Sequence, residues 1–194
     1  MMKIAVRAFV ATVVLAALTG LFYPAVMTGI AQVALKDKAD GSLVKVDGNT
    51  VGSSLIGQQW KGHQWFYGRP SAVDYDASTS SGSNLGPTSK DLNSAIEDRA
   101  GAIIKLEGPY NPGLTVATIP VDLLTSSSSG LDPDISEAAA MLQVPRIAAV
   151  AGIPEDAIRQ LVQSHVQGRD LGFLGEPRVN VLELNLALER LGSQ

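Results

Sequence analysis

AFVATVVLAALTGLFYPAVMTGIAQVAL, residues 8–35, contains no charged side chain in a chain that is 18% charged overall. As an α-helix rising about 1.5 Å per residue, the stretch would be roughly 42 Å long, against about 30 Å of bilayer hydrocarbon. It therefore predicts one transmembrane helix. A cleaved signal peptide is the alternative, but its apolar region normally has about 7–15 residues, and no Ala-x-Ala-like site lies between Thr19 and Lys38. The length favours an anchor.

The charges on either side of the apolar stretch predict its orientation. Lys3 and Arg7 precede it, so the positive-inside rule places residues 1–7 in the cytoplasm and residues 36–194 outside it, although Lys36 and Lys38 weaken the asymmetry. The exported part holds 13 basic and 19 acidic residues, a formal charge of −6, which disfavours nucleic acid as a partner. The absence of cysteine excludes disulfides and thiolate metal sites.

Every fourth residue of the apolar stretch is small, polar or helix-bending. Small residues at this spacing allow a second helix to approach closely, and a proline predicts a kink that a neighbouring helix would cover. Two interpretations follow: a plain anchor, or an assembly face that docks in a larger membrane complex. The residues of this assembly face are Thr12, Ala16, Gly20, Pro24, Thr28 and Gln32.

Residues 36–194 predict an α+β (mixed α/β) extracytoplasmic domain, with strands early and helices late. Residues 43–57 alternate around Asp47-Gly48, which predicts a β-hairpin. WFYG, residues 65–68, predicts a short strand whose aromatic side chains belong to the core. Residues 71–88 predict a long irregular loop, and residues 113–126 a buried strand interrupted by Pro120.

Helix signals dominate the remainder. Thr88 or Ser89 predicts the cap of a helix that runs to Glu107, and Asp134 or Ser136 the cap of a helix over 137–143. Further helices are predicted over 145–151, 155–167 and 181–191, the last capped by Asn180. Residues 144–166 are similar to a DNA-binding helix-turn-helix, but the second helix begins Glu-Asp and offers one arginine, so we expect a packed helical hairpin and no nucleic-acid partner.

Signals for chemistry are few. There is no G-x-S-x-G elbow, no GxxxxGK[ST] loop, and His63 and His165 lie far apart in sequence. Residues 82–89, GSNLGPTS, precede a predicted helix and form a candidate anion or nucleotide loop through Gly82, Ser83, Asn84 and Gly86.

TSSSSGLDPDIS, residues 125–136, admits several interpretations. Asp132 and Asp134 lack the further oxygen ligands of a hard-cation site, and the serines lack a placed base. We therefore interpret the stretch as a turn that ends a strand and caps a helix, with Asp132 available to face a partner or a passing cation.

The order of several motifs is specific. TGLFYPAVMTGIAQ, GSLV, VGSSLIGQ, FYGRPSA, SGSNLGPTS, SGLDPDIS, QVPRIA and GFLGEPRVNVLELNLAL follow one another along nearly the whole chain. This order resembles the C subunit of the Kdp-type potassium-transporting ATPase. The chain departs from the pattern at Asp134, where the family leads us to expect His or Gln, so no role is carried over to that side chain.

The resemblance implies a non-catalytic, single-pass accessory subunit of a high-affinity, ATP-driven potassium importer in the bacterial inner membrane. It implies three protein partners besides membrane lipid: a channel-like potassium-binding subunit, a P-type ATPase subunit and a small stabilising subunit. The family is described as assisting assembly and raising the ATP affinity of the ATPase subunit. We expect no cofactor on this chain, with ATP and potassium handled by the complex.

The residues expected to face a partner are Arg69, Asn84, Asp132, Glu176 and Arg178. The alternative function is a membrane-tethered exported enzyme or binding domain that uses the Ser/Gly-rich loops.

Overall fold

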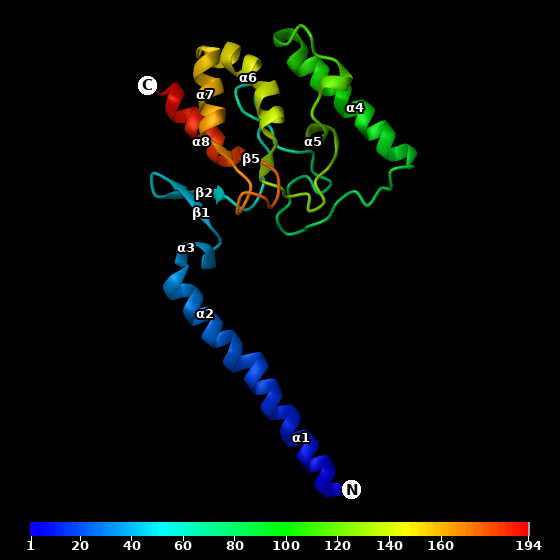
Figure 1. Ribbon diagram of the computed structural model, residues 1–194, viewed down its shortest axis with the longest axis vertical. Coiled ribbons are helices and arrows are strands. Elements are labelled where there is room, and N and C mark those ends of the chain that lie inside the picture. The colour runs from blue at the N-terminus through cyan, green and yellow to red at the C-terminus, as the bar shows by residue number, and fades with distance from the viewer. Residues whose placement is uncertain (194) are drawn as a thin grey trace. The chain divides into compact units, whose positions relative to one another are not determined.

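The computed structural model describes residues 1–193 and divides the chain into two compact units, Met1–Ser53 and Ser54–Gln194. Figure 1 shows the helices and strands of each unit. The two units are described separately below.

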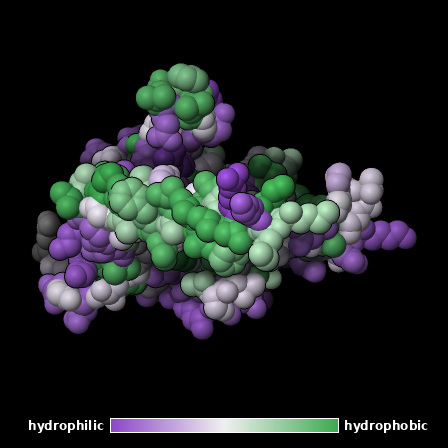
Figure 2. All heavy atoms as spheres, turned by 90° about the horizontal axis from the view of Figure 1, so that it is seen from below, coloured by the Kyte–Doolittle hydropathy of each residue, from purple (hydrophilic) through white to green (hydrophobic). Residues whose placement is uncertain are grey.

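The first unit is dominated by one long helix. α1 (Met2–Ala17), a π-helical turn (Leu18–Phe22) and α2 (Tyr23–Ala34) run without a break over 33 residues. None of these residues is buried, and the helix appears in Figure 2 as a hydrophobic band. Within residues 1–193 it is the one helix whose length and composition suit a bilayer span. The sequence thus predicted an apolar helix correctly, although the helix begins before residue 8.

Pro24 explains the π-helical turn. The Tyr23 amide donates to the carbonyl of Leu18, five residues back instead of four. Pro24 has no N–H for the carbonyl of Gly20, and its ring would press against that carbonyl in a regular α-helix. Widening the preceding turn relieves this contact. The distortion expected at Pro24 therefore takes the form of a wider turn on its N-terminal side.

The predicted hairpin is confirmed in the first unit. After α3 (Lys36–Ala39), β1 (Leu43–Val46) pairs antiparallel with β2 (Asn49–Ser53). Asp47 and Gly48 have φ values of 49° and 81°, the two left-handed positions that a type I′ turn requires. The paired strands end at Ser53, whose hydroxyl donates to the carbonyl of Gly41 at 2.7 Å.

The second unit combines helices with a small sheet. Its longer helices are α4 (Lys90–Glu107), α6 (Glu137–Ala151), α7 (Glu155–Ser164) and α8 (Val181–Gly192). β3 (Asp134–Ile135), β5 (Arg178–Asn180) and β4 (Val166–Gln167) form an antiparallel sheet in that order. α6 and α7 form a hairpin against which α8 packs (Figure 1). The mixed helix and sheet content agrees with the predicted class.

The core lies between these helices. Val144 and Ile147 of α6, Ile158 of α7 and Leu184 of α8 are fully buried. The helices begin where capping chemistry predicts. Side-chain oxygens of the cap residues accept from a backbone amide three residues on: Ser89 from Leu92 at 3.4 Å, Ser136 from Ala139 at 3.0 Å and Asn180 from Glu183 at 3.1 Å.

Two helix predictions were wrong in extent. The helices expected over 137–143 and 145–151 are one helix, α6, with Pro145 inside it. Buried residues on both sides of the proline hold the helix together, and the side-chain amide of Asn111 donates to the nearby carbonyl of Leu142 at 3.2 Å. α7 ends at Ser164, because Val166–Gln167 pair with β5 instead of continuing the helix.

The strand predicted over 113–126 is also wrong. The segment forms a 3₁₀ turn (Val116–Thr118) and the short helix α5 (Val121–Leu124). Pro120 lacks the N–H that a strand ladder needs and instead precedes the first turn of α5. The amide of Thr115 donates to the hydroxyl of Thr118 at 3.0 Å, which stabilises the 3₁₀ turn.

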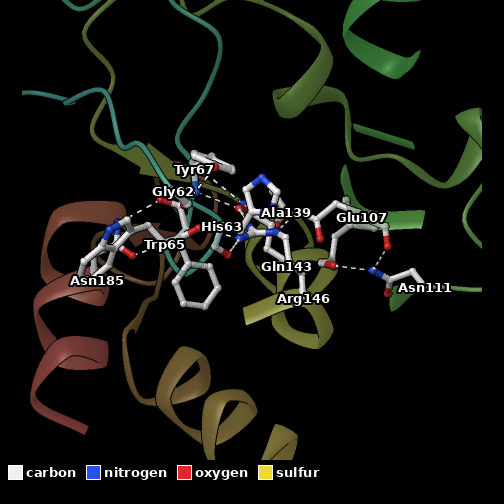
Figure 3. Close-up of polar contacts among 12 residues, drawn as sticks. Gly62, His63, Trp65, Tyr67, Glu107, Asn111, Ala139, Gln143, Arg146 and Asn185 are labelled. Atoms are coloured by element: carbon white, nitrogen blue, oxygen red, sulfur yellow. Dashed lines mark hydrogen bonds and ion pairs between the residues drawn. The ribbon is translucent and has the colours of Figure 1, made fainter. Parts of the chain in front are cut away.

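The strand predicted over 65–68 is absent from the described structure, since side chains replace its backbone partners. The amide of Asn185 accepts from the N–H of Phe66 at 2.9 Å and donates to its carbonyl at 3.0 Å (Figure 3). The side-chain amide of Gln143 likewise accepts from the N–H of Tyr67 at 2.8 Å and donates to its carbonyl at 3.1 Å. Phe66 is fully buried, as expected of a core residue, but its segment lies against helices α6 and α8 and not in a sheet.

Arg146 fixes the same segment from α6. Its guanidinium binds Glu107 at 2.8 Å, donates to the carbonyls of His63 and Trp65, and lies 5.0 Å from the ring of Tyr67 (Figure 3). Burial raises the pKa of the Glu107 carboxyl, while the charge of Arg146 opposes that shift. We call Glu107, Gln143, Arg146 and Asn185 the buried polar network. It ties α4, α6 and α8 to the extended chain that leads to Arg69.

Candidate functional site

Four of the five residues expected to face a partner line one hollow. Its volume is about 320 Å³. The four are Arg69, Asp132, Glu176 and Arg178, and the remaining lining residues are Val121, Asp122, Asp134, Ile135, Ser136 and Pro177. We call this feature the charged hollow. Asn84 does not line it.

Three parts of the chain build the charged hollow. Arg69 follows directly on the segment that the buried polar network holds. Asp132 lies in the turn before β3, and its carboxylate accepts from the amide of Asp134 at 3.0 Å. Arg178 begins β5, where Asp134 pairs with Asn180 across the two strands. The short sheet therefore brings Asp132 and Asp134, on either side of Pro133, close to Arg178.

Ion pairs order the charged hollow. Arg69 binds Asp132 at 3.0 Å, and Arg178 binds Asp134 at 3.2 Å. Burial, together with the nearby charge of Asp132, raises the pKa of the Asp134 carboxyl, and Arg178 opposes the shift. The Nε of Arg69 is buried and has no hydrogen-bond partner within the described chain. The hollow therefore holds two guanidinium groups among four carboxylates, those of Asp122, Asp132, Asp134 and Glu176.

Asp122 and Asp134 were not predicted as site residues. The Asp122 carboxylate accepts from the backbone and hydroxyl of Ser136, at 2.7 and 3.1 Å, which fixes the start of α6 beside the hollow. The sequence offered a signal only for Asp134, which stands two residues after Asp132 on the same turn. The contribution of Asp122 depends on α5, which the sequence pattern did not reveal.

Residues 125–136 cap a helix, as predicted, but they do not follow the end of a strand, which was also predicted. Ser136 caps α6, whereas the element that ends before the serines is the helix α5. Tyr75 also binds the chain beside this stretch. Its hydroxyl donates to the carbonyl of Arg69, and burial raises the pKa of the Tyr75 hydroxyl to about 12. A side chain at Gly57 would collide with the backbone carbonyl of Asp132, so this close approach requires glycine.

The Ser/Gly-rich loop before α4 binds mainly to itself and to the serine stretch. The side-chain amide of Asn84 donates to the carbonyl of Gly82 at 3.2 Å, and the amide of Ser81 donates to the carbonyl of Ser129 at 2.9 Å. A side chain at Gly82 would lie 3.0 Å from the carbonyl oxygen of Ser128. Ser83 and Gly86 are exposed. These contacts give the loop a packing role, and its proposed role in binding an anion or nucleotide stays a prediction.

The π-helical turn changes the geometry of the assembly face. At about 100° per residue, every fourth residue of an α-helix advances by about 40°, so Thr12 and Gln32 would lie about 200° apart. A π turn holds one extra residue and turns the rest of the helix back by about 100°. The six residues of the assembly face, from Thr12 to Gln32, therefore fall within an arc of about 100°, on one side of the helix. There is open space around Gly20, and the amide of Gln32 donates to Asp40 at 3.2 Å.

Comparison with known proteins matches this architecture to one family along the chain. A family model described as "KdpC: K+-transporting ATPase, c chain" matches residues 5–190. The chain is 50% identical to the potassium-transporting ATPase KdpC subunit of Bradyrhizobium diazoefficiens, in an alignment that covers 96% of each chain. It is 50% identical to the subunit of the same name from Caldanaerobacter subterraneus, covering 91% of this chain and 90% of the relative. The match includes the long apolar helix and the charged hollow alike.

Proposed function

Since this chain belongs to the KdpC family, the c chains of K+-transporting ATPases, we propose that it is a non-catalytic accessory subunit of an ATP-driven potassium import complex. The observation that carries the proposal is the match over residues 5–190, at about half identity to relatives over most of their length. The partners we propose are a channel-like potassium-binding subunit, a P-type ATPase subunit that hydrolyses ATP, and a small stabilising subunit.

We place the uncharged part of the helix, residues 8–34, in the inner membrane, with residues 1–7, which include its first turns, in the cytoplasm and residues 36–194 outside. This placement is supported by the apolar surface of the helix, none of which is buried, and by the position of Lys3 and Arg7 before the uncharged stretch. Protease treatment tests this orientation. We expect cleavage of the second unit in intact spheroplasts, and cleavage only after the inner membrane is opened would overturn the placement.

The assembly face holds the subunit in the complex. Small side chains on one side of the helix permit close contact with a partner helix, and the arc of about 100° gives that contact a single direction. Larger side chains at Gly20 and Thr28 would hold the helices apart. We expect the Gly20→Leu/Thr28→Leu variant to be lost when the complex is purified in mild detergent.

The matched control places the same side chain on the other side of the helix. Val14 and Val26 lie about 200° and 220° from Thr12, once the π turn is counted. The Val14→Leu/Val26→Leu variant should remain in the complex. Retention of both variants would show that this face does not direct assembly.

We propose further that the subunit raises the ATP affinity of the ATPase subunit as a catalytic chaperone. With the second unit outside and ATP inside, this effect is a coupling free energy carried through the membrane helices. We expect the ATP concentration needed for half-maximal hydrolysis to rise when the subunit is removed from the complex. An unchanged value would contradict the coupling.

A further inference from the structure

The turn between β4 and β5 exposes three large apolar side chains. Leu171 is 83% exposed, Phe173 69% and Leu174 48%, whereas hydrophobic residues nearby in the sequence, such as Val179 and Leu184, are fully buried. We call residues 171–174 the apolar tip. Neither the fold nor the assembly face uses these side chains, and exposed apolar groups gathered in one place are typical of interaction sites.

The apolar tip is held in one conformation. Backbone bonds join Asp170 and Leu174 in both directions at 2.9 Å, and Leu171 and Gly172 adopt left-handed φ values of 54° and 82°. Arg169 binds Glu176 at 2.7 Å across the base of the turn. A preformed tip loses little conformational freedom on binding, so its buried area contributes more fully to affinity.

The chain runs directly from the apolar tip into the charged hollow. Glu176, Pro177 and Arg178 line the hollow, and Arg178 also lies 3.6 Å from Asp170 at the base of the tip. Val121, 69% exposed, adds an apolar group to the lining of the same hollow. The side chains that line the hollow form ion pairs, but four carboxylates and two guanidinium groups give them a formal charge of −2, which favours a basic side chain as the occupant.

We propose that the apolar tip and the charged hollow form one docking surface for an extramembrane loop of a partner subunit, one that carries Lys or Arg beside an apolar pocket. This inference rests on the proposed function. Phe173 and Leu171 enter the pocket, and the basic side chain of the partner enters the hollow among Asp132, Asp134 and Glu176. Aromatic anchors beside a polar rim are the usual composition of an interface centre.

Charge favours a protein over a lipid surface as the occupant. Residues 54–194 contain 10 basic and 16 acidic residues, a formal charge of −6, and anionic headgroups repel such a unit. The charges around the tip are also paired with each other, which leaves no cluster of free Lys or Arg for phosphate groups.

Affinity measurements with the full-length chain test the docking surface. Phe173→Ser and Glu176→Arg variants are added to the complex purified without this subunit, and the dissociation constants are measured at low and high salt. We expect each variant to bind at least about 10-fold more weakly, as for truncated interface anchors. The effect of Glu176→Arg should shrink at high salt. Val150→Ser, at a position 43% exposed on α6, is the control and should bind as the parent does.

A cross-link identifies the occupant. The chain has no cysteine, so Phe173→Cys provides a single site for a photoreactive label. We expect cross-links to an extramembrane loop of a partner subunit. Cross-links to lipid or to a second copy of this chain, or parent-like affinity of both variants, would overturn the docking surface. If the unaltered chain fails to bind any potassium ATPase complex, the proposed function itself is wrong.

Discussion

Replacing Arg146 by methionine should lower the free energy of unfolding of the second unit far more than replacing an exposed arginine does. Arg146 is fully buried and is the partner of Glu107 at 2.8 Å. Methionine keeps most of the side-chain volume but removes the charge, so Glu107 would remain buried without a counterion. Breaking a buried ion pair in this way costs about 3–5 kcal/mol.

The carbonyls of His63 and Trp65 lose a donor in the same variant, which places the expected loss in the upper part of that range. At about 3 °C per kcal/mol for a unit of this size, a loss of about 4–5 kcal/mol lowers the melting temperature by about 12–15 °C. Thermal unfolding of the full-length chain in detergent, followed by circular dichroism, measures this shift.

A control variant and a double variant separate the loss of the buried ion pair from the loss of an arginine in general. Arg159 forms an exposed pair with Glu155 on α7, so Arg159→Met should change stability by less than about 1 kcal/mol. Adding Glu107→Gln to Arg146→Met removes the stranded charge and should recover part of the loss. Equal melting temperatures for Arg146→Met and Arg159→Met would show that the buried polar network does not hold the fold.

Three further predictions concern the same unit. Asn185→Leu leaves the N–H and C=O of Phe66 buried and unpaired, so urea unfolding should show a loss of about 1–3 kcal/mol for each group. Gly57→Ala forces a methyl group against the carbonyl of Asp132 and should lower stability by about 1–3 kcal/mol in the same assay, with Gly101→Ala, which meets open space, as its control. The pKa of the Asp134 carboxyl is raised in the folded chain above its ordinary value of 3.8, so the protonated carboxyl adds to the free energy of unfolding at low pH. This added stability is lost as the pH rises from 3.8 through the folded pKa. Urea unfolding midpoints of the parent should therefore fall over this pH range, and those of Asp134→Asn should fall less.

Local chemistry explains which elements the sequence revealed. The apolar helix, the Asp47-Gly48 hairpin and the helix caps depend on residues close together in the chain. The helix, the hairpin and the cap at Asn180 were predicted, and Ser89 and Ser136 were each one of two residues predicted as a cap. Each follows from a local rule: hydrophobic length, left-handed turn residues or a side-chain oxygen three residues before an amide.

Tertiary partners explain the errors. The segment 65–68 has the composition of a strand, but its backbone is paired with Gln143 and Asn185, which lie 76 and 119 residues further along the chain. Pro145 has the local character of a helix boundary, but core packing on both sides keeps α6 whole. No local pattern contains these contacts.

The candidate site divides in the same way. Arg69, Asp132, Glu176 and Arg178 were selected from motifs spread along the chain, and the structure brings them into one hollow. Asp122 was missed because α5 was taken for a strand. The apolar tip was missed because its exposure follows from three left-handed residues, at 171, 172 and 175, which turn its side chains away from the core.

Membership of a potassium-transporting ATPase complex is tested by affinity purification of the full-length chain from its own cells, with ATP hydrolysis measured with and without potassium. The chain should carry with it a P-type ATPase subunit and a potassium-channel-like subunit, and the purified material should hydrolyse ATP in a potassium-stimulated manner. Purification of the chain without an ATPase, or with an ATPase that potassium does not stimulate, would show that the chain is not a subunit of such a complex.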